Sequence, residues 1–339
     1  MEIGIDSFAS AMYGSNNLRS VDAMEQLLQR IELADQAGLD IYGIGEHHKK
    51  EFLDSATAVI LSAAAARTKN IRLASAVAVL SAADPVRVYQ SFATLDLISK
   101  GRAEIVVGRG SSIEAYPLFG FNLNDYDELF KEKLDLFLKV RDNEFVTWSG
   151  KFRPAINNLP VYPRAVQEKL PVWLGVGGTP ESFIRAGSLG LPLMVAIIGG
   201  QTHRFRPLID LYRQAGAAAG YQPEELKVGI HSPGYVSATT EKAIEEYYPG
   251  YAELWTKLGL ERGWPPVTKA KFDGLIDDEG VLIVGSPERA AEKILRHSEA
   301  LGGISRFTFQ MDNAGLTHMQ LMKSIELIGT KMIPLIQKG

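Results

Sequence analysis

Short apolar runs alternate with segments of helical periodicity along almost the whole chain. The first apolar run covers residues 3–8 and predicts a β-strand. After it, apolar residues recur every three or four positions from Val21 to Ala34, which predicts a helix that ends near Gly38. The same pattern predicts seven further strands, at 39–45, 71–80, 102–108, 172–176, 193–197, 226–231 and 304–310.

A helical segment follows each of these strands. Three of the helices begin with a polar residue and a proline, at Asp84-Pro85, Thr179-Pro180 and Ser286-Pro287. This pair is favoured at the N-cap and the first helical position. The helices that follow the later strands are predicted at 55–67, from 85 onward, and at 124–141, 180–189, 203–219, 286–300 and 317–328. Eight strand–helix units are the number in a TIM barrel, so the sequence predicts an α/β fold of the (β/α)8 class as one domain, 1–339.

Two segments are longer than ordinary connections. Residues 143–170, after the fourth strand and helix, contain a hairpin pattern at 145–152 with Ser149-Gly150 at its turn. Residues 232–282, after the seventh strand, are rich in tyrosine and tryptophan. This second insertion would rise from the carboxyl ends of the strands, where TIM barrels carry their active sites. Both a mobile lid over an apolar pocket and a packed decoration fit the pattern.

Composition narrows the classes of function. The chain has 339 residues, a net charge of −4 and no cysteine. The charge gives no basic surface for nucleic acid or an anionic membrane. The lack of cysteine excludes disulfides, thiolate metal sites and cysteine nucleophiles. No signal peptide and no membrane-spanning apolar run are visible, so a cytoplasmic protein is expected.

The most informative string is Glu46-His47-His48, at the end of the second predicted strand. Successive side chains of a strand point to opposite faces, so at most one histidine is aimed at the barrel mouth. There it would serve as an acid or base. A structural pair bonded to backbone is the alternative. Metal binding ranks low because the adjacent histidines have no clustered companions in the sequence.

Two glycine-containing loops predict contacts to a phosphate. Gly108-Arg109-Gly110 follows the fourth strand and combines close backbone approach with an arginine. The loop 177–182 offers open amides at the start of a helix, which favour an anion. A dinucleotide site would need an acidic residue at the end of the next strand, and 193–200 has none, so a single phosphate fits better. The turn at 284–288 competes with this loop but is interpreted as a plain helix cap.

A set of short motifs extends over nearly the whole chain. They are Glu46-His47-His48, Ala76-Val77-Ala78-Val79-Leu80, Asp84-Pro85-Val86-Arg87, Ser99-Lys100-Gly101-Arg102, Gly108-Arg109-Gly110, Gly177-Gly178-Thr179, Gly190-Leu191-Pro192 and Val284-Gly285-Ser286-Pro287. Together they resemble the bacterial luciferase-like family of flavin-dependent monooxygenases. The resemblance implies a TIM barrel that binds reduced FMN, or coenzyme F420 in some branches, without a Rossmann domain.

The resemblance also implies roles for individual residues. It implies that His47 takes part in the chemistry and that the flavin ring rests against a non-proline cis peptide near Ala76-Val77. It implies that Arg109 and the loop 177–182 hold the flavin phosphate. The residues it places at the cofactor are Glu46, Ala76, Val77, Gly108, Arg109, Gly177, Gly178, Thr179 and Ser182.

Two positions depart from the luciferases themselves. Gly108 stands where they carry a reactive cysteine, and Gly177-Gly178 stands where they carry Glu-Ser. Light emission from a long-chain aldehyde is therefore not expected. The family also pairs through the region of helix 55–67, whose alanines permit close helix–helix approach, so a homodimer is expected. Packing of that helix on its own barrel is the alternative.

The function expected from these residues and this resemblance is FMN-dependent monooxygenation. Reduced FMN, delivered by a separate reductase, and O2 would act on an unidentified, apolar small molecule. An F420-dependent hydride-transfer enzyme is the first alternative, although residues 177–184 contain no Lys or Arg for the acidic tail of F420. A non-catalytic flavin-binding barrel is the second. The identity of the substrate is not encoded in any recognisable pattern.

Overall fold

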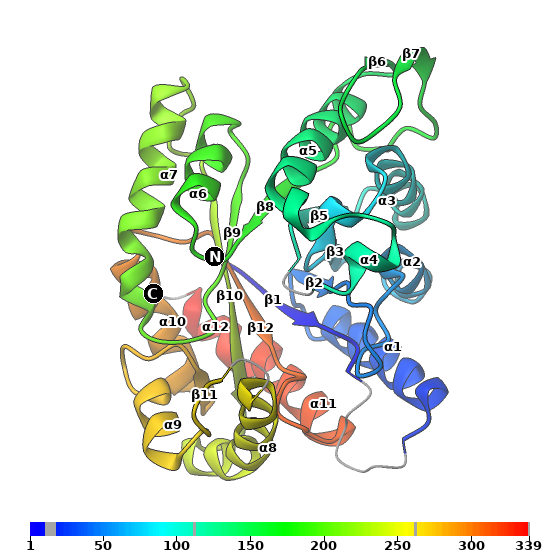
Figure 1. The fold of residues 1–339 in the computed structure, drawn as a ribbon. Coiled ribbons are helices and arrows are strands. Elements are labelled where there is room, and N and C mark those ends of the chain that lie inside the picture. The colour runs from blue at the N-terminus through cyan, green and yellow to red at the C-terminus, as the bar shows by residue number, and fades with distance from the viewer. Residues whose placement is uncertain (11–17, 111–112, 261–262, 338–339) are drawn as a thin grey trace.

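The computed structural model describes residues 1–10, 18–110, 113–260 and 263–337, and their centre is a closed barrel of parallel strands (Figure 1). Strand β12 pairs with both β10 and β1, which closes the barrel. Its strands are β1 (Glu2–Ser7), β2 (Ile41–Ile44), β3 (Arg72–Ser75), β5 (Ala103–Gly108), β8 (Val172–Val176), β9 (Leu193–Ala196), β10 (Val228–Val236) and β12 (Arg306–Gln310). The predicted (β/α)8 fold is confirmed.

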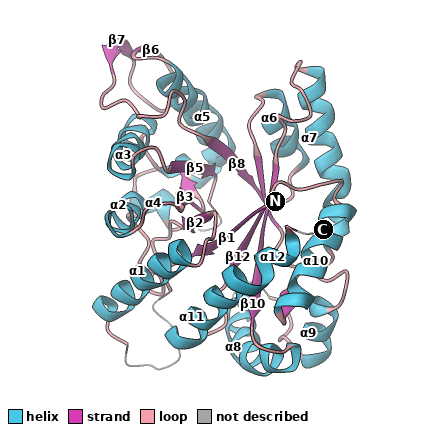
Figure 2. Ribbon diagram, turned by 180° about the vertical axis from the view of Figure 1, so that it is seen from behind, coloured by secondary structure: helices cyan, strands magenta, loops and turns pink. Residues whose placement is uncertain are grey.

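Helices surround the barrel, as the views from both sides show (Figures 1 and 2). The main ones are α1 (Ser20–Gln36), α2 (Thr57–Arg67), α3 (Pro85–Ser99), α5 (Tyr126–Asp142), α6 (Pro180–Ser188), α7 (Arg206–Ala218), α10 (Pro287–Ala300) and α11 (His318–Leu327). Shorter elements are η1 (Leu80–Ala82), α4 (Ala115–Leu118), η2 (Leu123–Asp125), η3 (Thr202–Phe205), η4 (Ile328–Met332) and α12 (Ile333–Ile336).

The predicted helix starts follow from local hydrogen bonding. The Asp84 carboxylate accepts hydrogen bonds from the backbone N–H groups of Val86 and Arg87, and so caps α3. Pro85 takes the first helical position, where no donor is needed. Gly38 lies two residues beyond the end of α1, directly after the C-cap residue Ala37, with φ of 81°, the left-handed conformation expected there.

Two strands differ from their predicted bounds. The predicted strand 71–80 is interrupted, because β3 ends at Ser75, the Ala76–Val77 peptide is cis, and the short β4 (Ala78–Val79) pairs with β5. The strand predicted to end at His231 continues to Val236, so residues 232–236 belong to β10 rather than to the insertion. Ser, Pro and Gly at 232–234 are weak strand formers, and pairing with β11 (Ile283–Gly285) and β12 keeps them extended.

The two insertions form compact substructures. Strands β6 (Phe145–Trp148) and β7 (Ile156–Pro160) make an antiparallel hairpin beside α5, with a connection longer than the predicted Ser149-Gly150 turn (Figure 1). The second insertion forms α8 (Thr240–Leu260) and α9 (Lys269–Ile276). Its Tyr247 ring stacks 6.0 Å from Tyr235 of β10 and 5.5 Å from Tyr251. Among the described residues, no helix is long and apolar enough to cross a membrane.

Lys293 of α10 is buried under this insertion, and its ammonium group donates a hydrogen bond to the carbonyl of Leu282 at 2.8 Å. Burial, together with the cation of Arg289, lowers the pKa of Lys293 from 10.5 to about 7. Between these two pH values the unfolded chain holds a proton that the folded chain lacks, so stability rises with pH across the interval. We expect the melting temperature of Lys293→Met, relative to wild type, to fall steadily from pH 7 to pH 10. A constant difference over that range would contradict this assignment.

Candidate active site

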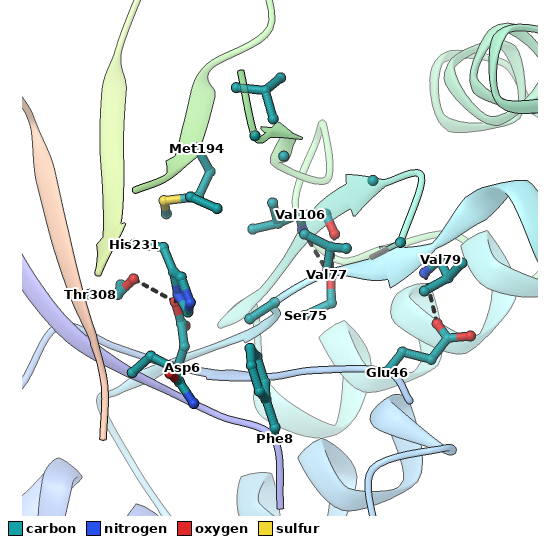
Figure 3. Close-up of a pocket in the computed structure, with 18 of the residues that line it drawn as sticks. Asp6, Phe8, Glu46, Ser75, Val77, Val79, Val106, Met194, His231 and Thr308 are labelled. Atoms are coloured by element: carbon teal, nitrogen blue, oxygen red, sulfur yellow. Dashed lines mark hydrogen bonds and ion pairs between the residues drawn. The ribbon is translucent and has the colours of Figure 1, made fainter. Parts of the chain in front are cut away.

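A cavity of about 340 Å³ opens at the carboxyl ends of the barrel strands (Figure 3). This volume lies in the range of small-molecule sites. Its lining is mostly apolar and comes from almost every strand of the barrel and from α8. Prominent among the lining residues are Phe8, Val77, Val106, Met194, Ile198 and Trp255. The cavity therefore lies at the face where TIM barrels carry their active sites.

His47 is one of the polar residues that line this cavity, and it is held in one orientation. Its Nδ1 lies 2.9 Å from Oδ2 of Asp54, and its backbone N–H donates to Oδ1 of the same residue at 3.0 Å. Asp54 is fully buried, and burial raises the pKa of its carboxyl. The rings of Phe8 and Phe52 pack 4.7 and 4.5 Å from the imidazole. With Nδ1 occupied by Asp54, Nε2 is the ring nitrogen left for a ligand.

His48 does not line the cavity, so one of the two adjacent histidines faces it, as expected. The reason is not strand alternation, because β2 ends at Ile44 and both histidines lie in the loop after it. Its Nε2 lies 3.3 Å from Oε1 of Glu46, and its ring meets Phe119 edge-on at 5.0 Å. The other carboxylate oxygen of Glu46 accepts a hydrogen bond from the backbone N–H of Val79 at 2.8 Å. Glu46 thus links the loop that follows β2 to the short strand β4. It also lines the cavity, but both of its carboxylate oxygens already have a partner.

The Ala76–Val77 segment forms one wall, and two glycines make room for it. A Cβ on Gly108 or on Gly175 would lie 2.7 Å from a methyl group of Val77, closer than atoms approach. Because neither position carries a side chain, the Val77 side chain can pack directly on the backbone of β5 and β8.

Arg109 connects the cavity to the first turn of α6. Its guanidinium donates to Asp127 at 2.6 Å and to the Thr179 hydroxyl at 3.2 Å, and it lies 5.0 Å from the centre of the Tyr126 ring. Thr179 is the N-cap residue of α6, as predicted, although its hydroxyl accepts from Arg109 instead of capping the helix. A guanidinium and a helix N-terminus at one place form a donor set suited to phosphate.

The structure thus brings most of the expected residues together. Glu46, His47, Ala76, Val77, Gly108, Arg109 and Gly177 line the cavity. Gly178, Thr179 and Ser182 lie beyond its edge, at the start of α6. Gly177 and Gly178 have open space where a Cβ would stand, so a ligand can approach their backbone. Ser182 is buried in the first turn of the helix.

The sequence reasoning missed a second histidine in the cavity. His231 of β10 lies with Nδ1 2.6 Å from Oδ2 of Asp6 in β1, and the Thr308 hydroxyl of β12 donates to the same oxygen (Figure 3). One signal was available, since Asp6 interrupts the apolar run of residues 3–8. Asp6 and His231 are 225 positions apart, so the pattern along the chain gave no indication that they pair.

Comparison with known proteins finds relatives that match nearly the whole chain and share its fold. The chain is 26% identical to 3,6-diketocamphane 1,6-monooxygenase of Pseudomonas putida, over 89% of this chain and 90% of the relative. The oxygenating constituent of 3,6-diketocamphane monooxygenase from the same species, solved in complex with FMN, superposes with a TM-score of 0.81 at 20% identity, covering 99% of this chain and 98% of that one. The coenzyme F420-dependent tetrahydromethanopterin reductase of Methanopyrus kandleri superposes at 0.74 with 20% identity, covering 98% of both chains.

The sequence profile described as luciferase-like monooxygenase matches residues 1–303. This match covers the barrel strands up to β11 and both insertions. Because it extends over most of the chain, it establishes the resemblance noted from the motifs. The chain belongs to the luciferase-like monooxygenase family.

Proposed function

We propose that this protein is a monooxygenase that uses reduced FMN and O2 to oxidise a small, largely apolar molecule. One observation carries the proposal: an apolar cavity is joined through Gly177 to a cationic site made by Arg109 and the first turn of α6. A flat apolar ring system with one phosphate group matches this pair of features. The FMN complex of a structural neighbour supports the same choice.

The residues present fit the phosphate and the ring system of FMN. Arg109 would exchange its exposed partner Asp127 for the phosphate, with further donors from the amides at 177–179 and the hydroxyl of Ser182. The wall made by Ala76 and Val77, with glycines beneath, would receive the ring system. When bound, reduced FMN supplies the electrons that activate O2. The side chains of Phe8, Ile198 and Trp255 keep the cavity apolar and exclude water from the reacting atoms.

His47 would hold or accept a proton at Nε2, beside the reacting atoms. Asp54 fixes the tautomer, because an acceptor at Nδ1 keeps a proton there. General acid–base catalysis by a positioned histidine contributes about 10²- to 10⁴-fold to a rate. This oriented pair favours an enzyme over a non-catalytic flavin-binding barrel.

Coenzyme F420 is the second candidate, because a structural neighbour depends on it. Its acidic tail extends beyond the phosphate and calls for additional cations. In this chain residues 177–184 contain no Lys or Arg. Arg185, the next cation along α6, lies 5.8 Å from the centre of the Phe130 ring. The charges around the phosphate site therefore favour FMN.

The decisive experiment is an anaerobic titration with reduced FMN and, separately, with reduced F420, followed by rapid mixing with air. We expect tighter binding of reduced FMN and oxidation of the bound flavin by O2. If reduced F420 binds more tightly than reduced FMN, and the bound F420 does not react with O2, the protein is instead an F420-dependent hydride-transfer enzyme. Binding of neither cofactor would overturn the proposal.

Arg109→Ala should weaken the binding of FMN by about 10- to 100-fold, because it removes a charge-assisted hydrogen bond to phosphate. Riboflavin lacks the phosphate, so its affinity should change little. Calorimetric titration of both flavins measures the difference. Asp127→Asn is the matched control, since it removes the competing carboxylate and should not weaken FMN. An equal loss of affinity for both flavins in Arg109→Ala would show that Arg109 serves the ring or the fold instead.

The proposal extends to partners. A separate reductase would supply reduced FMN, and the protein would work as a cytoplasmic homodimer. Helix α2 exposes Val59, Ala63 and Ala66, and the Val59 side chain is 70% exposed. The substitutions Ala63→Arg and Ala66→Arg together should give soluble monomers, because an interface core tolerates unpaired charge poorly. Sedimentation at micromolar concentration tests this, and a monomeric wild type would end the dimer proposal.

A further inference from the structure

The cavity contains two histidine–aspartate pairs, and the proposed function has used only one of them. His47 is paired with Asp54, and His231 is paired with Asp6. The ring of Phe8 lies between them, 4.7 Å from the His47 ring and 5.9 Å from the His231 ring. Phe8 and His231 are nearly parallel, at 23°. Both histidines line the same cavity, so a ligand there can reach either one.

The second pair is built into the barrel itself. His231, Thr308 and Asp6 come from the neighbouring strands β10, β12 and β1, and His231 stands directly opposite Thr308 in the register. All three side chains are buried apart from the surface they present to the cavity. Gly43 of β2 completes the arrangement, because a Cβ at that position would lie 2.1 Å from Oδ1 of Asp6. The carboxylate of Asp6 is therefore held by the side chains of His231 and Thr308 and by the backbone of β2 at Gly43.

These contacts determine what His231 can do. Asp6 accepts hydrogen bonds from both His231 and Thr308, as an ionised carboxylate does. A carboxylate at Nδ1 keeps a proton on that nitrogen. Nε2 then carries a lone pair towards the cavity and can take up a proton from a ligand.

The other charged groups that line the cavity are already engaged. Glu46 is bonded to the Val79 amide, and Arg306 is bonded to Glu104 and Glu2. Arg109 lies at the phosphate end, bonded to Asp127. His47 is therefore the group that competes with His231 for a proton-bearing ligand.

We propose that His231, positioned by Asp6, is a second acid–base residue that binds and deprotonates a hydroxyl group of the substrate. The substrate class is then a phenol or an enol with an apolar body, since an aliphatic hydroxyl is too weak an acid for imidazole. In this step the O–H bond breaks, the proton passes to Nε2, and the electron pair stays on the oxygen as an oxyanion beside the imidazolium. The inference rests on the proposed function, because it identifies the substrate of the same cavity.

The test uses the flavin-free full-length protein and 4-nitrophenol, whose ionised form has its own absorption band. The measurement is made at a pH where the free compound is mostly neutral. We expect the ratio of ionised to neutral compound to be at least about tenfold higher in the bound state than in solution, because a charge-assisted hydrogen bond stabilises the anion. His231→Gln keeps a donor for Asp6 but has no titratable nitrogen, so the added ionisation should disappear. Asp6→Asn should reduce it.

Two further variants show whether a loss of phenol ionisation is caused by the missing His231 imidazole or by another change. Ser232→Ala alters the next residue of β10, whose hydroxyl bonds to the Ile197 carbonyl, and the ionisation should persist there. His47→Gln tests the competing histidine. Bound phenol that stays neutral in the wild type, or ionisation that persists in His231→Gln, would overturn the inference. Ionisation lost in His47→Gln and kept in His231→Gln would overturn it as well.

FMN titration of the same proteins keeps this inference distinct from the proposed function. If His231→Gln binds FMN normally but wild-type protein does not ionise or bind the phenol, the substrate class is wrong and the flavin assignment stands. If the wild type ionises the phenol but binds no flavin, the flavin assignment fails. Circular dichroism and thermal unfolding of each variant show whether the barrel remains folded.

Discussion

Replacement of His47 by alanine is expected to slow turnover by about 10²- to 10⁴-fold, the usual contribution of a positioned acid or base. The fold and the affinity for FMN should be almost unchanged, because His47 is not among the phosphate donors proposed above, which are Arg109 and the start of α6. Turnover can be measured in a screen of small apolar phenols and ketones, with a flavin reductase as the source of reduced FMN.

His48→Ala provides the matched control. His48 is the neighbouring residue, but its ring faces Glu46 and Phe119 and does not line the cavity. We expect turnover of this variant to fall far less than that of His47→Ala, because the His48 imidazole does not face the cavity. Equal losses in both variants would mean that the loop, and not the His47 imidazole, is what the reaction needs.

The second large effect is expected on stability, at an ion pair near the amino-terminal ends of the barrel strands. Arg306 is 1% exposed and Glu104 is 2% exposed, and the two form a bidentate ion pair inside the barrel. The Arg306 guanidinium also lies 4.0 Å from the centre of the Trp173 ring and donates to Glu2. Glu104→Ala leaves a buried cation without its main partner, which should lower the free energy of unfolding by about 3–5 kcal/mol.

Denaturant unfolding of the variant measures this loss. Glu25→Ala is a suitable control, because it breaks the exposed ion pair with Arg67, which solvent screens, and it should change the free energy of unfolding far less than Glu104→Ala. Replacing both members, as in Glu104→Gln with Arg306→Met, should cost less than Glu104→Ala alone, since no unpaired charge remains. A small loss in Glu104→Ala would show that Glu2 alone neutralises Arg306.

The pattern of apolar residues was sufficient to predict the order of the strands and helices. Each strand of a parallel barrel is buried and each helix has one apolar face, so both leave a clear pattern in the sequence. Proline and N-cap residues placed the starts of α3, α6 and α10 correctly. The pattern did not show the break after Ser75, since Ala76–Leu80 is as apolar as the strand before it. The motif resemblance, not the periodicity, indicated a cis peptide there.

The candidate site was predictable where its residues are adjacent in sequence. Glu46, His47 and the loop residues Gly108 and Arg109 belong to short motifs, and the structure places them around one cavity. Asp6 and His231 belong to no motif. Their pairing depends on the register between β10, β12 and β1, which is set by the closure of the whole barrel. Tertiary pairings of this kind leave no local trace in a single sequence.

The extension of β10 has a consequence for how this cavity can diversify. Its last residues pair with β11, and Gly250 packs so closely on the Ala314 carbonyl that a Cβ there would lie 1.7 Å from the oxygen. The first half of α8 is thereby fixed to the barrel. Trp255 lies one and a half turns beyond Pro249, which interrupts the hydrogen bonding of α8. Substitutions in this last part of α8 can reshape the roof of the cavity while Arg109 and the loop 177–182 stay as they are. If the proposed function holds, selectivity and cofactor use can therefore evolve independently in this barrel.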